Sequence, residues 1–163
     1  MNFFSDNHHL KFLFDSLELE KLAGLKEDNF KEKELYPYAP SDQQEAREGY
    51  RRVLELTGDI AANFIAPVSG EIDKEGNTLK DDGVIYSQHL KACMDVLSKA
   101  DLMGFILPRR FGGLNLPTVI YTMAIDIVSR ADASLMNVFG LQGIAETINV
   151  FASEEIKKKY LMV

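Results

Sequence analysis

The sequence lacks the features that mark several protein classes. Its single cysteine, Cys93, excludes an internal disulfide, and no apolar run is long enough to span a bilayer. With 18 Lys and Arg against 25 Asp and Glu, the net charge of −7 argues against a nucleic-acid surface. The first residues lack the basic start and apolar core of a signal peptide. We therefore expect an acidic cytoplasmic protein that binds no nucleic acid and spans no membrane.

Motifs for catalysis are equally scarce. His8 and His9 have no further His or Cys near them and point in different directions, so they do not predict a metal site. His89 is expected to be a surface or packing residue. Cys93 lies on an apolar helical stripe, which favours a small core residue over a nucleophile. The glycines at 112–113 lack the spacing of a phosphate-binding loop.

Helical periodicity is what the sequence does contain. One domain with a real core is expected from 163 residues of which 46% are hydrophobic. No segment of convincing length has strand periodicity, so the fold class is all-α, an orthogonal or up-down helical bundle. The expected helices cover residues 41–66, 84–102, a segment that starts at Pro117, residues 134–151 and residues 153–161.

Capping and breaking residues refine these helices. Ser41 is placed to cap the first helix, and Pro67 and Gly70 are expected to end it, with an exposed loop over residues 71–82. Pro117 suits the first position of a helix, where its missing N–H costs no hydrogen bond.

The segment over residues 134–151 is the second expected helix after a Pro/Gly-rich turn at 104–117 and has one charged side chain, Glu146. A helix that is apolar nearly all round is expected to be buried nearly all round, which would place it at the centre of the domain. Asp132 or Ser134 is expected to cap it, and Ser153 to cap the last helix.

The first 40 residues look like a separate arm. Residues 2–25 carry many large apolar groups, with Ser5 or Asp6 placed to cap a helix, and residues 36–40 form a proline-punctuated strap. We expect an arm and linker over residues 1–40, a domain over residues 41–163, and an arm that lies across a partner subunit or further domains. The basic clusters at 109–110 and 157–159 are expected to be solvated.

Three motifs occur in a characteristic order: GFILPRRFGGLNLP at 104–117, SRADASL at 129–135 and SEEIKKKYL at 153–161. Together they resemble the N-terminal helical domain of the acyl-CoA dehydrogenase family, and the similarity covers residues 41–161. The leading segment resembles the extra N-terminal arm of a bacterial subgroup that includes the methylthiopropionoyl-CoA dehydrogenases.

The resemblance implies a flavoenzyme that uses FAD to convert an acyl-CoA substrate to the 2-enoyl-CoA and passes electrons to an electron-transfer flavoprotein. It also implies a homo-oligomer. The flavin and the catalytic base of the family belong mainly to later domains, so no catalytic residue is expected in this chain. The apolar end at 161–163 favours a chain cut before the flavin-binding β-domain.

By the same resemblance, the helix at 134–151 supplies one wall of the acyl-tail pocket. The implied tail-facing residues are Leu135, Met136 and Phe139, with Gly140 and Gln142 nearby. Phe139 would shorten the cavity and Met136 would adapt to a thioether or branched tail, which predicts a short or medium acyl group. The competing hypothesis is a helical interaction module that keeps this scaffold but performs no redox chemistry.

Overall fold

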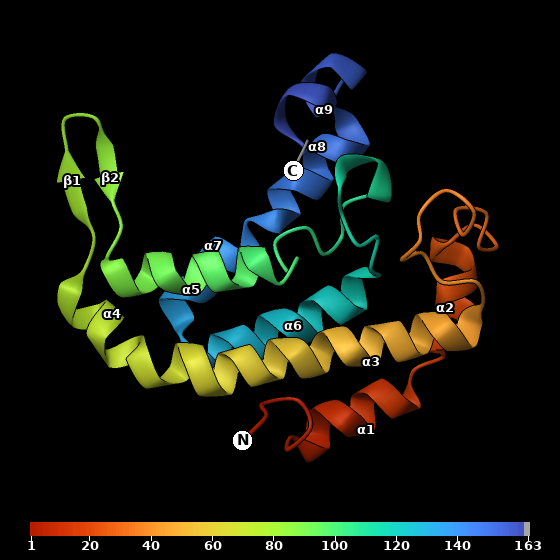
Figure 1. Cartoon of the computed structure of the whole chain (residues 1–163), viewed down its shortest axis with the longest axis horizontal. Helices are drawn as coiled ribbons and strands as arrows, with labels where there is room; N and C mark the ends of the chain where they lie inside the picture. The colour runs from red at the N-terminus through yellow and green to blue at the C-terminus, as the bar shows by residue number, and fades with distance from the viewer. Residues whose placement is uncertain (162–163) are drawn as a thin grey trace.

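The computed structural model describes residues 1–161. Residues 162–163, which belong to the apolar end on which the predicted cut was based, lie outside this range. Helices make up nearly all of its regular structure (Figure 1), so the all-α prediction is confirmed. No helix in the described range is both long and apolar enough to cross a membrane. The helices are α1 (His8–Ser16), α2 (Leu19–Lys26), α3 (Gln43–Ile60), α4 (Ser69–Glu75), α5 (Gln88–Lys99), α6 (Thr118–Ala131), α7 (Ala133–Gly140), α8 (Gln142–Phe151) and α9 (Glu154–Tyr160).

A small antiparallel hairpin, β1 (Thr78–Lys80) and β2 (Gly83–Ile85), interrupts the helices. All six of its residues are exposed, and the hairpin projects from the body between α4 and α5 (Figure 1). The prediction of a plain loop at 71–82 is therefore wrong, as is a helix start at 84. The next helix begins at Gln88, where the Ser87 hydroxyl caps it by accepting from the backbone N–H of Leu90.

Helix α3 begins as the apolar spacing predicts but does not end where expected. Asp42, rather than Ser41, caps it, and Ser41 instead donates its hydroxyl and backbone N–H to Glu45. The chain continues through a π-helical turn (Ala61–Ile65) and a 3-10 turn (Ala66–Val68) into α4. Pro67 is tolerated because it lies in the first turn of the 3-10 segment. Gly76, with φ of +61°, follows the end of α4.

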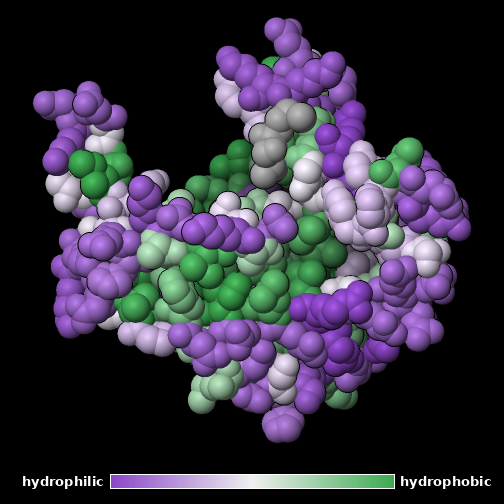
Figure 2. All heavy atoms as spheres, viewed as in Figure 1, coloured by the Kyte–Doolittle hydropathy of each residue, from purple (hydrophilic) through white to green (hydrophobic). Residues whose placement is uncertain are grey.

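The predicted helix over 134–151 is two helices, α7 and α8, and only α7 places apolar side chains, Leu135 and Phe139, in the main core. Of the residues in α8, only Gln142 is buried, whereas Phe151 is 82% exposed. The central helix is instead α6, which buries seven of its 14 residues between α3 and α7. Figure 2 shows apolar side chains gathered in the hollow between α3 and α5, bordered on both sides by hydrophilic ones.

The N-terminal segment packs onto the long helix α3 of its own chain. Asn7, not Ser5 or Asp6, caps α1. The backbone N–H of Phe3 donates to the carbonyl of Gly58 at 3.1 Å, and a Cβ at Gly58 would lie 2.7 Å from the backbone nitrogen of Phe4. Position 58 therefore has to be glycine for the two segments to approach so closely.

Half of the large apolar groups in residues 2–25 belong to this chain's own core, whereas Phe12, Leu13, Leu17 and Leu25 are exposed. The core side chains are at most 8% exposed, and they join the cluster that contains α3, α5, α6 and α7. The rings of Phe4 and Phe14 meet edge to face at 5.9 Å. The expectation that this face lies across a partner or further domains is wrong for these residues, because α3 already covers them: Phe3, Phe4, Leu10, Phe14 and Leu19.

Candidate functional site

The Pro/Gly-rich segment 104–117 doubles back on itself, and several of its backbone N–H groups donate to carbonyls of the same segment. The N–H of Leu114 donates to the carbonyl of Gly104 at 2.9 Å, and that of Leu116 to the carbonyl of Phe105 at 2.8 Å. A Cβ at Gly113 would lie 2.1 Å from a backbone oxygen of the same loop. The N–H groups of Gly112 and Gly113 donate to the carbonyls of Arg109 at 2.9 Å and Pro108 at 3.3 Å, so the glycine pair has no free amide for a phosphate.

Asp132 joins three segments at the start of α7. Its Oδ1 accepts from the backbone N–H of Leu135 at 2.7 Å and from the Ser134 hydroxyl at 2.6 Å, and its Oδ2 accepts from the Ser69 hydroxyl at 2.7 Å. Burial alone would raise the pKa of Asp132, but these hydrogen bonds outweigh it and lower the pKa. The predicted cap is confirmed, and Asp132 also ties α7 to α4.

Helix α7 directs two of the implied tail-facing residues into the core. Leu135 and Phe139 are both 0% exposed. The Phe139 ring lies 5.7 Å from that of Phe105 and 6.0 Å from that of Tyr121. The Tyr121 hydroxyl donates to the backbone carbonyls of Gly140 at 2.9 Å and of Phe139 at 3.2 Å. An aromatic cluster therefore holds this helix in place.

The remaining implied residues are Met136 and Gly140 on α7 and Gln142 at the start of α8. Met136 is only partly buried, one turn before Gly140. Gln142 is 7% exposed and makes three hydrogen bonds: its amide donates to the carbonyls of Leu102 and Phe139, and its Oε1 accepts from the N–H of Phe105 at 2.8 Å. Gln142 thus fixes the junction of α7 and α8 to the 104–117 segment. Contact of these residues with an acyl tail stays a prediction.

Arg109 is the main correction to the predicted surface. Both Glu27 oxygens accept from its guanidinium, at 2.6 and 2.9 Å, and the two side chains are each 2% exposed. Glu32 adds a third bond at 3.1 Å. The prediction that this arginine is solvated is wrong, because the turn after α2 folds over it. The neighbouring Arg110 is half exposed, in line with the predicted solvated position, and it pairs with Glu154 at 3.2 Å.

The lysine cluster, His89 and Cys93 have no arrangement that indicates catalysis or metal binding. Residues 158–159 are exposed as predicted, whereas the Lys157 side chain is 12% exposed and pairs with Glu154 at 3.0 Å. His89 lies at the surface and bonds Glu75 at 2.6 Å. Cys93 is fully buried, and burial raises the pKa of its thiol to about 11. Within the described residues, no group of three His, Cys, Asp or Glu is arranged to hold a metal ion.

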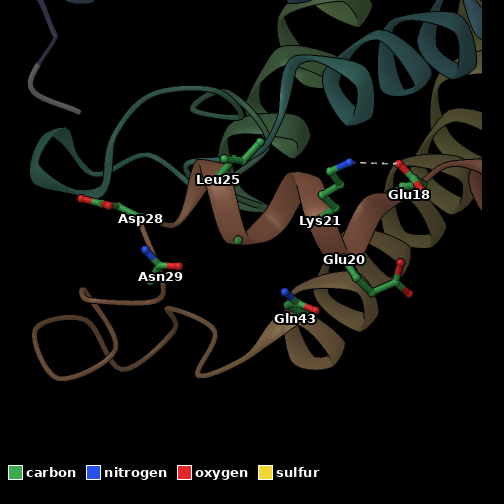
Figure 3. Close-up of a pocket in the computed structure, with 8 residues that line it drawn as sticks. Glu18, Glu20, Lys21, Leu25, Asp28, Asn29 and Gln43 are labelled. Carbon is green, nitrogen blue, oxygen red and sulfur yellow. Dashed lines mark ion pairs between the residues drawn. The ribbon is translucent and has the colours of Figure 1, made fainter.

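A groove of about 570 Å³ lies beside α2 (Figure 3). Its labelled side chains come from α2, from the turn after it and from the start of α3, and the ion pair drawn joins Lys21 to Glu18 along α2. None of the implied tail-facing residues contributes to it. It is a charged surface groove lined by Glu18, Glu20, Lys21, Gly24, Leu25, Asp28, Asn29 and Gln43.

Comparison with known proteins finds a match over most of the chain. The model of the family described as "Acyl-CoA dehydrogenase, N-terminal domain" matches residues 40–162. The chain is also 30% identical over 116 residues to the 3-methylmercaptopropionyl-CoA dehydrogenase of Ruegeria pomeroyi, an alignment that covers 68% of this chain. The chain spans 19% of the length of that relative.

Proposed function

Because the chain belongs to the acyl-CoA dehydrogenase family, we propose that it is the N-terminal helical domain of an FAD-dependent acyl-CoA dehydrogenase. The family match over residues 40–162 carries the proposal. The enzyme would remove a proton from the α-carbon and a hydride from the β-carbon of an acyl-CoA thioester, giving the 2-enoyl-CoA. When bound, FAD accepts the hydride, and an electron-transfer flavoprotein would then reoxidise it in a homo-oligomeric enzyme.

We assign no flavin contact and no catalytic residue to this chain. In the glycine-rich segment at 104–117, the amides of residues 111–116 donate to carbonyls of the same segment, so the glycine pair offers no site for a diphosphate. The residues present therefore do not fit the cofactor by themselves. Flavin binding and the catalytic base belong, in this proposal, to parts of a longer protein.

The domain's own contribution would be one wall of the acyl-tail pocket. Met136 is partly accessible on α7 and would touch the tail, while Leu135 and Phe139 would set the depth of the pocket from behind. Gly140 and the Gln142 bonds would fix the end of this wall. Because Phe105 and Tyr121 hold the Phe139 ring, the wall resists displacement by a longer tail. A short or medium acyl group, such as a thioether acid, fits this arrangement.

The surface of α8 supports a larger assembly. Several large apolar side chains on or next to this helix are more than half exposed. Such an apolar patch in contact with water is unfavourable and is typical of an interaction surface. We propose that further domains of the same enzyme cover Ile144, Val150 and Phe151 on α8, together with the exposed Leu141 just before it.

The test is a kcat/KM series for acyl-CoA tails of increasing length, measured on the protein from the complete reading frame. We expect a maximum at short or medium tails, including 3-methylthiopropionyl-CoA, with bleaching of the flavin absorbance by substrate. Met136→Phe should reduce kcat/KM more for longer tails than for propionyl-CoA. Met94→Phe, at a partly buried methionine on α5, is the matched control and should lower kcat/KM by the same factor for every tail length.

Each outcome of this series decides between hypotheses. A preference for long tails would contradict the short or medium assignment. An equal effect of Met136→Phe on kcat/KM for every tail would contradict the proposal that α7 forms a wall of the acyl-tail pocket. A folded full-length protein without flavin or dehydrogenase activity would favour a helical interaction module.

A further inference from the structure

A second pocket, of about 230 Å³, lies under the proline-punctuated strap on the α3 side of the molecule. Its walls come from four separate stretches: Glu27 after α2, Tyr38 in the strap, Tyr50 on α3 and Arg109 in the 104–117 segment. The Tyr38 hydroxyl donates to the carbonyl of Gly113 at 3.4 Å, so the strap is tied across the pocket. The volume suits a small molecule or a few waters, not a cofactor.

Two residues that line this pocket each have a buried donor atom without a hydrogen-bond partner within residues 1–161: the Tyr50 hydroxyl and the Nε–H of Arg109. Tyr50 is 2% exposed and the Arg109 side chain 2%. Buried polar groups in folded proteins are nearly always paired, and leaving them unpaired is costly. Burial raises the pKa of Tyr50, so its hydroxyl keeps its proton and remains a donor.

The rest of the lining determines what kind of molecule would satisfy those donors. Apolar side chains from α3 and the 104–117 segment form much of the wall, including Val53 and Leu116. The charged groups balance: Glu27 and Glu45 against Arg52 and Arg109. Glu27 and Glu32 already compensate Arg109, so the pocket presents donors without an excess of positive charge.

We propose that this pocket is a binding site for a small neutral molecule with an acceptor oxygen and an apolar body, such as a ketone, an amide or an alcohol. Its oxygen accepts from the Tyr50 hydroxyl and the Arg109 Nε–H. The site lies apart from the α7 wall and does not depend on the proposed dehydrogenase activity. Because the walls come from the arm, α3 and the loop, occupancy also holds the strap against the core.

The experiment is a titration of the 163-residue chain with three five-membered-ring probes, followed through the Arg109 Nε–H resonance in ¹H–¹⁵N spectra. Cyclopentanone supplies a neutral acceptor, cyclopentene has the same ring without one, and cyclopentanecarboxylate is an anion. We expect saturable shifts with cyclopentanone alone, and a melting temperature that rises with its concentration. Tyr50→Phe should weaken cyclopentanone binding about three- to tenfold by removing one donor.

Gly49 provides a second variant that leaves both donors in place. It lines the pocket, and a Cβ there meets only the Arg52 guanidinium, at 4.0 Å, so Gly49→Leu has room to fold and should block binding. Gly70→Leu, on α4 with nothing within 4 Å of its Cβ, is the matched control and should bind as the parent does.

Three results would overturn the proposal. One is no shift of the Arg109 resonance at high probe concentration, which would mean that the pocket holds water only. Another is equal binding of cyclopentene or tighter binding of the carboxylate. The third is unchanged cyclopentanone binding in folded Gly49→Leu protein.

Discussion

Replacing Arg109 with methionine is expected to destabilise the domain strongly, although Arg109 lies in a loop. Its guanidinium holds both oxygens of Glu27 at 2.6 and 2.9 Å, and both side chains are 2% exposed. Methionine replaces most of the arginine stem but leaves the Glu27 carboxylate buried without its cation. Since an unpaired buried charge is costly, the free energy of unfolding should fall by about 3–5 kcal/mol.

Urea unfolding followed by circular dichroism measures this loss directly. For a domain of this size, about 2–4 °C of melting temperature accompanies each kcal/mol, so Arg109→Met should melt about 6–20 °C lower. The double variant Arg109→Met, Glu27→Leu removes both charges. It should recover much of the loss, because apolar groups of similar volume often replace a buried ion pair at little cost.

The neighbouring arginine is the control for this prediction. Arg110 pairs with Glu154 at 3.2 Å, but its side chain is 50% exposed. Arg110→Met should therefore cost less than about 1 kcal/mol. Equal losses for the two single variants, or a double variant no more stable than Arg109→Met, would refute the reasoning that burial of the Glu27 pair decides the effect.

Three further predictions follow from the described contacts. Gly58→Ala should cost about 1–3 kcal/mol and expose residues 1–16 to proteolysis, because its Cβ would lie 2.7 Å from the Phe4 backbone nitrogen. Asp132→Asn should cost about 0.5–2 kcal/mol at neutral pH. Because the folded-state pKa of Asp132 is lowered, that stability is present above the unfolded pKa of about 3.9 and is lost as pH falls further, so urea midpoints of the two proteins should converge in acid. Cys93, with a pKa of about 11, should react with a thiol reagent at pH 8 only as the chain unfolds.

Each of these has a clear contrary result. Gly70→Ala, on an open surface of α4, is the control for Gly58→Ala, and similar proteolysis of both variants would contradict the close approach. A constant gap between Asp132→Asn and the parent from pH 7 to pH 2 would show that ionisation of Asp132 does not matter. Rapid modification of Cys93 in the absence of urea would show that its helix opens readily.

Much of the helical fold could be predicted, but the candidate site could be predicted only in part. The spacing of apolar residues in α3, α5 and α6 and the caps Asp132 and Ser153 are local signals, and the structure bears them out. The motifs at 104–117 and 129–135 indicated α7 as part of the candidate site. No local pattern indicated that Gln142 would bond the end of α7 to the 104–117 segment. That bond spans 37 residues in the sequence.

By itself, then, the sequence determined where most of the helices lie and the caps Asp132 and Ser153, because these depend on residues within a few turns of one another, and its motifs indicated the family. Only the tertiary structure decided which surfaces are buried. Helix α8 is as apolar as a core helix, yet it packs only Ala145 and Ile148 against a small separate cluster and leaves its other large apolar side chains exposed. Arg109 is charged, yet it lies inside because Glu27, 82 residues earlier, meets it there. Burial of a charge depends on its partner, and the partner is brought by the fold.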